Sequence, residues 1–302
     1  MSSQPRVLVV GGTGAQGGGV ACHLLAEGRY RVRCLTRRLD SVTAIALADA
    51  GAEVVEGDMA DRESIDAALA GCEAAFGVTS YFEHLAAEYE LGAQFLDAIE
   101  SSAVEHLVLS TLPSASELSA GKLDVPQFEH KARLEILVRQ KEIFATFVHV
   151  SFYFENFLYN CPPRRQDDGS YAFGFPLGDA VLSAVAVGDI GGVVAAILRK
   201  PDAFQGRTVK IVGDQRSAAE YAAIIGAVTG RTVRYRHIPH GVFASLPLPG
   251  AAGLADMFEL YRSHVRPDPR DLADSLRLYP GMLSFERWAR EHRDTLIAAM
   301  DD

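Results

Sequence analysis

Short runs of β-branched and aliphatic residues alternate with longer amphipathic segments over the first half of the chain. The segment 88–102 shows helical spacing clearly, because Leu91, Phe95 and Ile99 fall on one apolar stripe. Such alternation is typical of βαβ units around a parallel sheet. The pattern predicts strands at Val7–Val10, Tyr30–Thr36, Glu53–Glu56, Ala74–Val78, His106–Ser110 and Ala145–Val150.

The rhythm changes after Phe154, where the stretch CPPRRQDDGSYAFGFPLGD predicts loops or a hairpin. Beyond it we expect Asp189 to cap the helix IGGVVAAILRK and Ser217 to cap the helix AAEYAAIIGAVTG. Short strands are predicted at Val209–Val212 and Val233–Tyr235, within a second lobe.

The predicted fold class is therefore α/β: a Rossmann doubly wound parallel sheet with a smaller α+β carboxyl-terminal lobe. We place the Rossmann domain at residues 1–155 and the lobe, completed by helices, at residues 156–302. Open α/β sheets bind ligands at the carboxyl ends of their strands, so we expect a cleft there, closed by the lobe.

Composition removes several classes of function. A chain of 302 residues with 48% hydrophobic residues can bury a full core. We expect no secretory signal, because MSSQPR runs straight into the apolar strand VLVV without a basic region, a long apolar stretch or a cleavage site. We expect no membrane span, because the most apolar stretch, Val242–Ala255, is broken by prolines and glycines. The four cysteines are widely spaced, so we expect no metal site and a reducing, cytoplasmic location. A net charge of −10 argues against direct nucleic-acid binding.

The first predicted strand runs straight into GGTGAQGGG and then into a helical stretch. Gly11, Gly14 and Gly17 would allow a tight turn, approach of the backbone to a pyrophosphate, and close packing of helix on strand. The N–H groups at the start of the helix would then receive the phosphates. An ordinary glycine-rich turn is the alternative, but this one stands at the first strand–helix junction of a βαβ series.

The second strand ends in Thr36-Arg37-Arg38, where NAD-specific folds place a carboxylate on the ribose 2′-hydroxyl. A guanidinium pairs instead with a 2′-phosphate, which predicts NADP(H) as the cofactor, with Arg37 as the principal ligand. Arg38 could equally be a solvated charge.

The next two strand ends would complete the pocket. Asp58 and Met59 would border the adenine, and Thr79-Ser80-Tyr81 would lie beside the pyrophosphate and the nicotinamide ribose. Each of these segments could instead be only a helix cap or a loop.

Several segments together resemble the NmrA-like family, atypical members of the short-chain dehydrogenase/reductase superfamily, and look closest to its NADPH-sensor branch. They are GGTGAQGG, LTRR, GAEVVEGDMAD, FYFENF at Phe152–Phe157 and GRTVKIVGDQRSAAEYAAII. With the assignments above, the resemblance implies cofactor contacts from Gly11, Gly12, Thr13, Gly14, Ala15, Gln16, Gly17, Arg37, Arg38, Asp58, Met59, Thr79, Ser80, Tyr81, Lys131, Tyr153, Phe154, Glu155 and Asn156.

The chain departs from the superfamily at its catalytic pair. Typical members place a tyrosine four residues before a lysine, and the tyrosine transfers the proton that accompanies hydride. Here QFEHK places Gln127 before Lys131, and an amide is neither acid nor base near neutral pH. Ser110 or Thr111 stands at the usual serine position. Lys131 could also be a solvated helix residue, since Gln127 and Glu135 flank it at helical spacing.

Two functions remain open. In the first, NADP(H) occupancy orders the loops at Tyr81–His84 and Leu112–Val125 and changes a surface offered to a protein partner. In the second, the chain is an NADPH-dependent reductase of a quinone, an enone or a similar carbonyl compound, with Lys131, Tyr81 or Tyr153 as the catalytic proton donor. Tyr153 could also be plain core. The missing tyrosine favours the sensor; the sequence names neither partner nor oligomeric state, and a homodimer stays open.

Overall fold

The structure, a computed structural model, describes residues 4–301. They form two compact units, each assembled from separate stretches of chain. The first unit holds the residues up to Pro113, His130–Val150 and Val187–Lys210; the second holds Ser114–Glu129, Ser151–Ala186 and the residues from Ile211 on. Because a compact unit is not by itself an independently folding domain, the boundary after residue 155 stays a prediction.

A seven-stranded sheet forms the centre of the first unit, in the order β11-β6-β5-β4-β1-β2-β3. Strand β1 lies between β4 and β2 and runs parallel to both, with Val9 opposite Cys34 of β2 on one side and Phe76 of β4 on the other. The six predicted strands are confirmed to within one residue at each end. The strands are β1 (Arg6–Val10), β2 (Arg31–Thr36), β3 (Glu53–Glu56), β4 (Ala74–Gly77), β5 (His106–Thr111), β6 (Ala145–Val150) and β11 (Thr208–Ile211).

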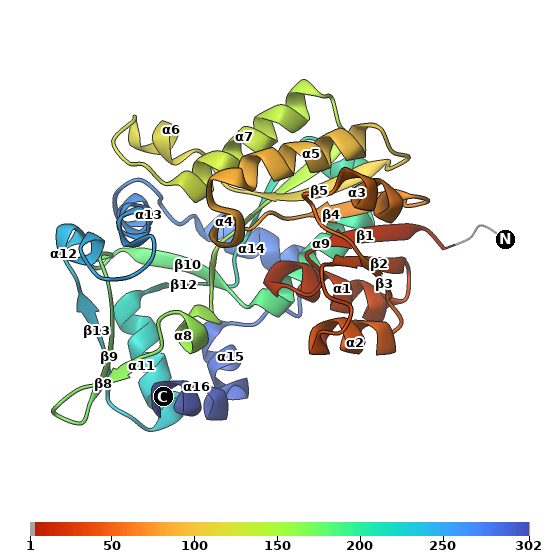
Figure 1. Cartoon of the computed structure of the whole chain (residues 1–302). Helices are drawn as coiled ribbons and strands as arrows, with labels where there is room; N and C mark the ends of the chain where they lie inside the picture. Colours follow the sequence, from red (N-terminus) through yellow and green to blue (C-terminus); the bar gives the residue numbers. More distant parts are fainter. Residues whose placement is uncertain (1–3, 302) are drawn as a thin grey trace. The chain divides into compact units, whose positions relative to one another are not determined.

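Helices cover both faces of this sheet, which confirms the doubly wound Rossmann fold (Figure 1). On one face lie α3, α5 and α7, and a Cβ on Gly92 of α5 would meet Leu134 of α7 at 2.5 Å. On the other face α1 packs against α9. The helices are α1 (Ala15–Glu27), α2 (Val42–Asp49), α3 (Arg62–Leu69), α4 (Tyr81–His84), η1 (Leu85–Ala87), α5 (Glu88–Glu100), α7 (Pro126–Gln140), α9 (Val187–Leu198) and α10 (Pro201–Phe204).

Two elements that we assigned to the second lobe belong to the first unit instead. The predicted strand at Val209–Val212 corresponds to β11, which adds a seventh strand beside β6, and Phe147 N donates to Arg207 O at 2.9 Å there. Helix α9 is the other element, and its glycines explain why it lies on α1: a Cβ on Gly191 would sit 2.1 Å from Gly19 O. Asp189 lies inside the first turn of α9 and does not cap it, because the helix begins at Val187.

The second unit contains two three-stranded sheets, β12-β10-β7 and β13-β9-β8. The predicted hairpin is confirmed as the antiparallel pair β8 and β9, and Ser217 caps α11 in a capping box with Glu220. The elements of the second unit are α6 (Ala115–Ser119), β7 (Phe152–Tyr153), α8 (Asn156–Tyr159), β8 (Arg164–Arg165), β9 (Tyr171–Phe175), β10 (Val181–Val185), β12 (Asp214–Ser217), α11 (Ala218–Thr229), β13 (Val233–His237), α12 (His240–Ala244), α13 (Ala251–Ser263), α14 (Pro269–Leu278), α15 (Phe285–Glu291) and α16 (Arg293–Asp301).

Aromatic rings fill the core of the second unit. Phe285 packs edge-on against Tyr221, with ring centroids 4.6 Å apart, and stacks on Trp288 at 5.5 Å. Phe154 and Phe157 complete this cluster. Among the residues that the structure describes, no helix is both long enough and apolar enough to span a membrane.

Candidate cofactor-binding site

The glycine loop between β1 and α1 has the backbone that its sequence predicts. Gly11 adopts φ +67°, a left-handed conformation that favours glycine, and Gly14 N donates to Gly11 O at 2.8 Å. A Cβ on Gly17 would lie 2.2 Å from Gly11 O and 2.8 Å from Val10 O, so only glycine lets α1 approach the strand end this closely. The first turn of α1 has no acidic side chain to compete for its N–H groups.

Arg37 and Arg38 follow β2, and both side chains are exposed. The Arg37 guanidinium pairs with the Glu83 carboxylate, with Nη2 3.2 Å from Oε2, and each side chain is 55% exposed. Arg38 is held through its backbone, because its N–H donates to Thr36 Oγ1 at 3.3 Å. Thr36 Oγ1 also lies 3.3 Å from Thr13 Oγ1, which ties the end of β2 to the glycine loop.

Asp58 and Met59 form a turn after β3. Asp58 Oδ1 accepts from Ala60 N at 2.9 Å, and Met59 O accepts from Gln94 Nε2 of α5 at 3.1 Å. Both side chains are partly exposed. The turn is thus fixed by its own backbone and by α5, and its role beside an adenine stays a prediction.

The end of β4 carries a buried ionic cluster built on Lys131 of α7. Lys131 Nζ donates to Thr79 O at 2.7 Å, to Thr79 Oγ1 at 2.8 Å and to Glu88 Oε1 at 2.6 Å. Thr79 Oγ1 in turn donates to Glu88 Oε1 at 2.7 Å. An ammonium has three N–H groups, so these three acceptors engage all of them.

Lys131 is 8% exposed and Glu88 is fully buried, so the interpretation of Lys131 as a solvated helix residue was wrong. Burial lowers the pKa of Lys131, and the adjacent Glu88 carboxylate offsets part of that shift.

Helix α7 also places His130 at this cluster, a residue that the sequence interpretation missed. His130 Nδ1 lies 3.3 Å from Glu88 Oε2, and its ring lies 5.6 Å from the ring of Tyr81. Glu88 was missed too, although it carries a detectable signal. It stands one helical turn before Gly92 on the buried stripe of α5, where a carboxylate requires a partner.

A second polar network lies farther along α7, around Glu135. Its carboxylate accepts from Arg139 Nη2 at 2.8 Å and from Thr111 Oγ1 at 3.1 Å, and His149 Nε2 lies 3.3 Å away. Burial alone would raise the pKa of Glu135, but the hydrogen bonds from His149, Arg139 and Thr111 outweigh it and lower that pKa to about 2. Thr111 is therefore engaged with Glu135 rather than with Lys131.

The segment Tyr153–Asn156 belongs to the second unit, whereas the other predicted contacts belong to the first. The Phe154 ring is fully buried in the aromatic core, and Glu155 Oε1 accepts from Trp288 Nε1 at 3.2 Å. Tyr153 pairs with Val185 of β10 and is half-buried. Asn156 begins α8 and accepts from Asn160 Nδ2 at 2.7 Å. The part that this segment takes in cofactor binding stays a prediction.

The model of the NmrA-like family matches residues 3–289 of this chain. The chain belongs to the NmrA-like family. The resemblance seen in its motifs is thereby confirmed, and the matched range extends over most of both units.

Curated NmrA-like relatives match most of the chain. An NmrA-like family domain-containing protein of Dictyostelium discoideum is 30% identical over 242 residues, which cover 77% of this chain and 80% of the relative. The NmrA-like family domain-containing oxidoreductase FrzB of Cladobotryum sp is 30% identical over 254 residues, covering 77% and 76%. The negative transcriptional regulator NmrA, solved in complex with NADP, has the same fold, with a TM-score of 0.80 and 21% identity over 96% of this chain and 95% of NmrA.

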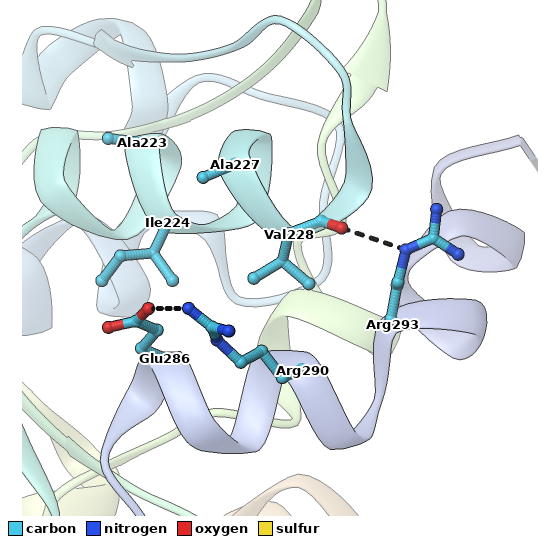
Figure 2. A pocket seen from close by; sticks show the side chains of 7 residues that line it. All are labelled: Ala223, Ile224, Ala227, Val228, Glu286, Arg290 and Arg293. Atoms are coloured by element: carbon cyan, nitrogen blue, oxygen red, sulfur yellow. Dashed lines mark hydrogen bonds and ion pairs between the residues drawn. The ribbon is translucent and has the colours of Figure 1, made fainter.

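This NmrA-like chain also has a pocket in its second unit, and none of the predicted site residues lines this groove (Figure 2). Ile224 and Val228 of α11 form its apolar wall, and the ion pair of Glu286 with Arg290 of α15 forms its polar wall. Arg293 closes one end by donating to Val228 O at 3.1 Å. No group in the groove suggests a reaction.

Proposed function

We propose that this NmrA-like protein binds NADP(H) in its first unit and acts as a redox-cofactor sensor through a protein partner. The observation that carries the proposal is the state of Lys131. It is buried and fully engaged by Thr79 and Glu88, and Gln127, four residues earlier in α7, cannot act as an acid or base. The residues suit holding a dinucleotide better than transferring a proton.

The first unit fits a dinucleotide at three points. In the loop at Gly11–Gly17 the backbone leaves no room for a Cβ at Gly12 or Gly17, and the first turn of α1 offers backbone N–H groups to a pyrophosphate. Arg37 is exposed at the end of β2, where a 2′-phosphate would be recognised. Lys131 would hold the nicotinamide ribose. NmrA, which has the same fold, has been solved in complex with NADP, and this supports the binding of NADP(H) by the present chain.

The binding half of the proposal is tested by calorimetric titration of the full chain with NADPH and NADH. A charge-assisted hydrogen bond contributes about 1.5–3 kcal/mol, so NADPH should bind roughly 10- to 150-fold more tightly than NADH. Arg37→Asp should remove that preference. Failure of the wild-type chain to bind NADPH at millimolar concentration would refute the proposal.

A sensor must also present different surfaces with and without cofactor, since a ligand shifts an equilibrium only by its differential affinity for two states. We propose that the segments Tyr81–His84 and Leu112–Val125 change on binding. Limited proteolysis with and without saturating NADPH should show altered cleavage in one of them. Identical cleavage patterns would contradict the sensor.

A reductase of a quinone, an enone or a similar carbonyl compound is the second candidate, favoured by the position of Tyr81 beside His130. Bound NADPH would supply the hydride, and Tyr81 or Lys131 would supply the proton. The oxidoreductase FrzB among the relatives supports this alternative. The test is oxidation of NADPH by a panel of quinones and enones. Oxidation that Tyr81→Phe or Lys131→Ala abolishes would show that the protein is a reductase and would refute the sensor function.

A further inference from the structure

One short segment carries the carboxylate partners of Arg37 and Lys131, the two cations that we propose bind the cofactor. Glu83 of α4 pairs with Arg37, and Glu88, five residues later at the start of α5, pairs with Lys131. All four residues belong to the first unit, and both pairs lie within 3.2 Å. The segment Tyr81–Glu88 therefore holds the positions of two cations that a dinucleotide would need.

The two pairs differ in their surroundings. Glu83 and Arg37 are each about half exposed, so water and salt weaken their attraction. Glu88 is fully buried and Lys131 nearly so, and the ammonium has no N–H group left for a ribose oxygen. A ribose hydroxyl can be bound only if one present acceptor gives up its place. Thr79 lies just beyond β4 and offers one acceptor from its backbone, whereas Glu88 directly follows η1 and presents its carboxylate at the end of a longer side chain.

The backbone between the two carboxylates is strained. Leu85 joins α4 to η1 at φ 48° and ψ −123°, a conformation that residues with a side chain rarely adopt. Its side chain is 57% exposed, and that of Phe82 is 65% exposed, so core burial does not hold the segment in this form. Within the segment, Glu83 pairs with Arg37, Glu88 pairs with Lys131, and the Tyr81 ring contacts His130.

From these observations we infer that the segment Tyr81–Glu88 is an internal competitor of the cofactor, a deduction that rests on the proposed binding of NADP(H). Glu83 leaves Arg37 when a 2′-phosphate arrives, and Glu88 releases one N–H of Lys131 to the nicotinamide ribose. Cofactor binding thereby frees both ends of a strained segment that carries exposed apolar side chains.

The two carboxylates should affect the preference for NADP(H) over NAD(H) differently. Only NADP(H) has the 2′-phosphate that competes with Glu83, whereas NAD(H) and NADP(H) share the ribose that competes with Glu88. Glu83 thus determines cofactor specificity by reducing the advantage of NADP(H), and Glu88 limits the affinity for both cofactors.

The experiment is calorimetric titration of the full-length chain with NADPH and NADH in three variants. Glu83→Gln should tighten NADPH binding by roughly two- to fivefold, the range of an exposed ion pair, and leave NADH binding unchanged. Glu88→Gln keeps an acceptor but removes its charge, and should tighten both by roughly fivefold. Glu90→Gln is the matched control: it removes the same charge from an exposed position of α5 and should change neither.

Glu83→Gln that tightens NADPH and NADH equally, or neither, would overturn the inference while the proposed function stands, provided that wild type binds NADPH. Loss of NADPH binding by wild type would overturn both. If Glu88→Gln does not fold, amide hydrogen exchange of the wild type decides its half. The exchange rates of amides within residues 81–88 should change on saturation with NADPH, and unchanged rates there would refute the proposed competition.

Discussion

The buried Lys131 cluster in the first unit and the aromatic cluster around Phe285 in the second are built from opposite materials. Lys131, Thr79 and Glu88 are polar groups that stay buried only because each satisfies another. Phe285, Tyr221 and Trp288 are rings held by contact area and edge-on or stacked packing. The contrast is between two clusters: the first loses its stability when one charge is left without its partner, and the second when contact area is removed.

The largest effect on stability should come from removing one ring of the aromatic cluster. Phe285→Ala removes a fully buried ring and should lower the free energy of unfolding by about 3–5 kcal/mol. Trp288, the single tryptophan of the chain, stacks on this ring, so its fluorescence in a urea titration reports the loss. Phe285→Leu keeps most of the volume and should cost much less. Equal losses in the two variants would mean that ring packing is not what stabilises the cluster.

Breaking the ionic cluster should cost about 3 kcal/mol, because Lys131→Met leaves the Glu88 carboxylate buried without its cation. The double variant Lys131→Met/Glu88→Gln removes both charges and should recover most of that stability, as measured by urea unfolding. It should not recover NADPH binding. Full recovery of binding would show that Lys131 serves the fold alone.

A smaller effect should follow acidification, through His106 at the start of β5. Its Nε2 lies 2.9 Å from Thr146 Oγ1, which donates to Phe204 O, and burial lowers the pKa of His106 to about 4, only partly offset by Asp202. Between pH 6.5, the ordinary pKa of histidine, and about pH 4, His106 is therefore protonated in the unfolded chain but neutral in the folded chain. Stability from this group is complete above pH 6.5 and is lost as the pH falls toward 4.

After allowance for solvent screening the expected loss is about 1–2 kcal/mol. Urea unfolding at several pH values measures it, and His106→Asn, which cannot titrate, should flatten the profile across this window. An equally steep profile in His106→Asn would assign the acid sensitivity to other groups.

The smallest effect is expected at the capping box of α11. Ser217→Ala removes the acceptor of Glu220 N and should lower the free energy of unfolding by about 1 kcal/mol, which a thermal melt detects. Ser217→Asp restores an acceptor and should recover most of the loss. A melt of Ser217→Ala that matches wild type would show that the cap contributes nothing.

The sequence predicted the local features of the first unit well, because each depends on neighbouring residues. The strands from β1 to β6 follow from apolar runs, and the backbone of the Gly11–Gly17 loop follows from its glycines. Features that depend on distant residues were harder to predict. Val209–Val212 was identified as a strand but not as a member of the seven-stranded sheet, since nothing local indicates that β11 pairs with β6, some 60 residues earlier.

The candidate site divides in the same way. Arg37 and Lys131 were identified as single residues, from a strand end and from a family resemblance. Their partners Glu83 and Glu88 were not, because the paired residues are 46 and 43 positions apart, and no spacing in a sequence indicates a pair at such a distance. A carboxylate on the buried stripe of α5 was the available clue, and it indicates only that some cation lies opposite.

The glycine contact between α1 and α9 has a consequence for how the protein is made. The two backbones touch at Gly19 and Gly191, yet about 160 residues separate the end of one helix from the start of the other. At the usual speed of translation, the ribosome needs roughly 10–30 s to synthesise that stretch. Throughout this interval the amino-terminal helix lacks its neighbour, so the nascent chain leaves an uncovered apolar surface exposed to chaperones until its second half emerges.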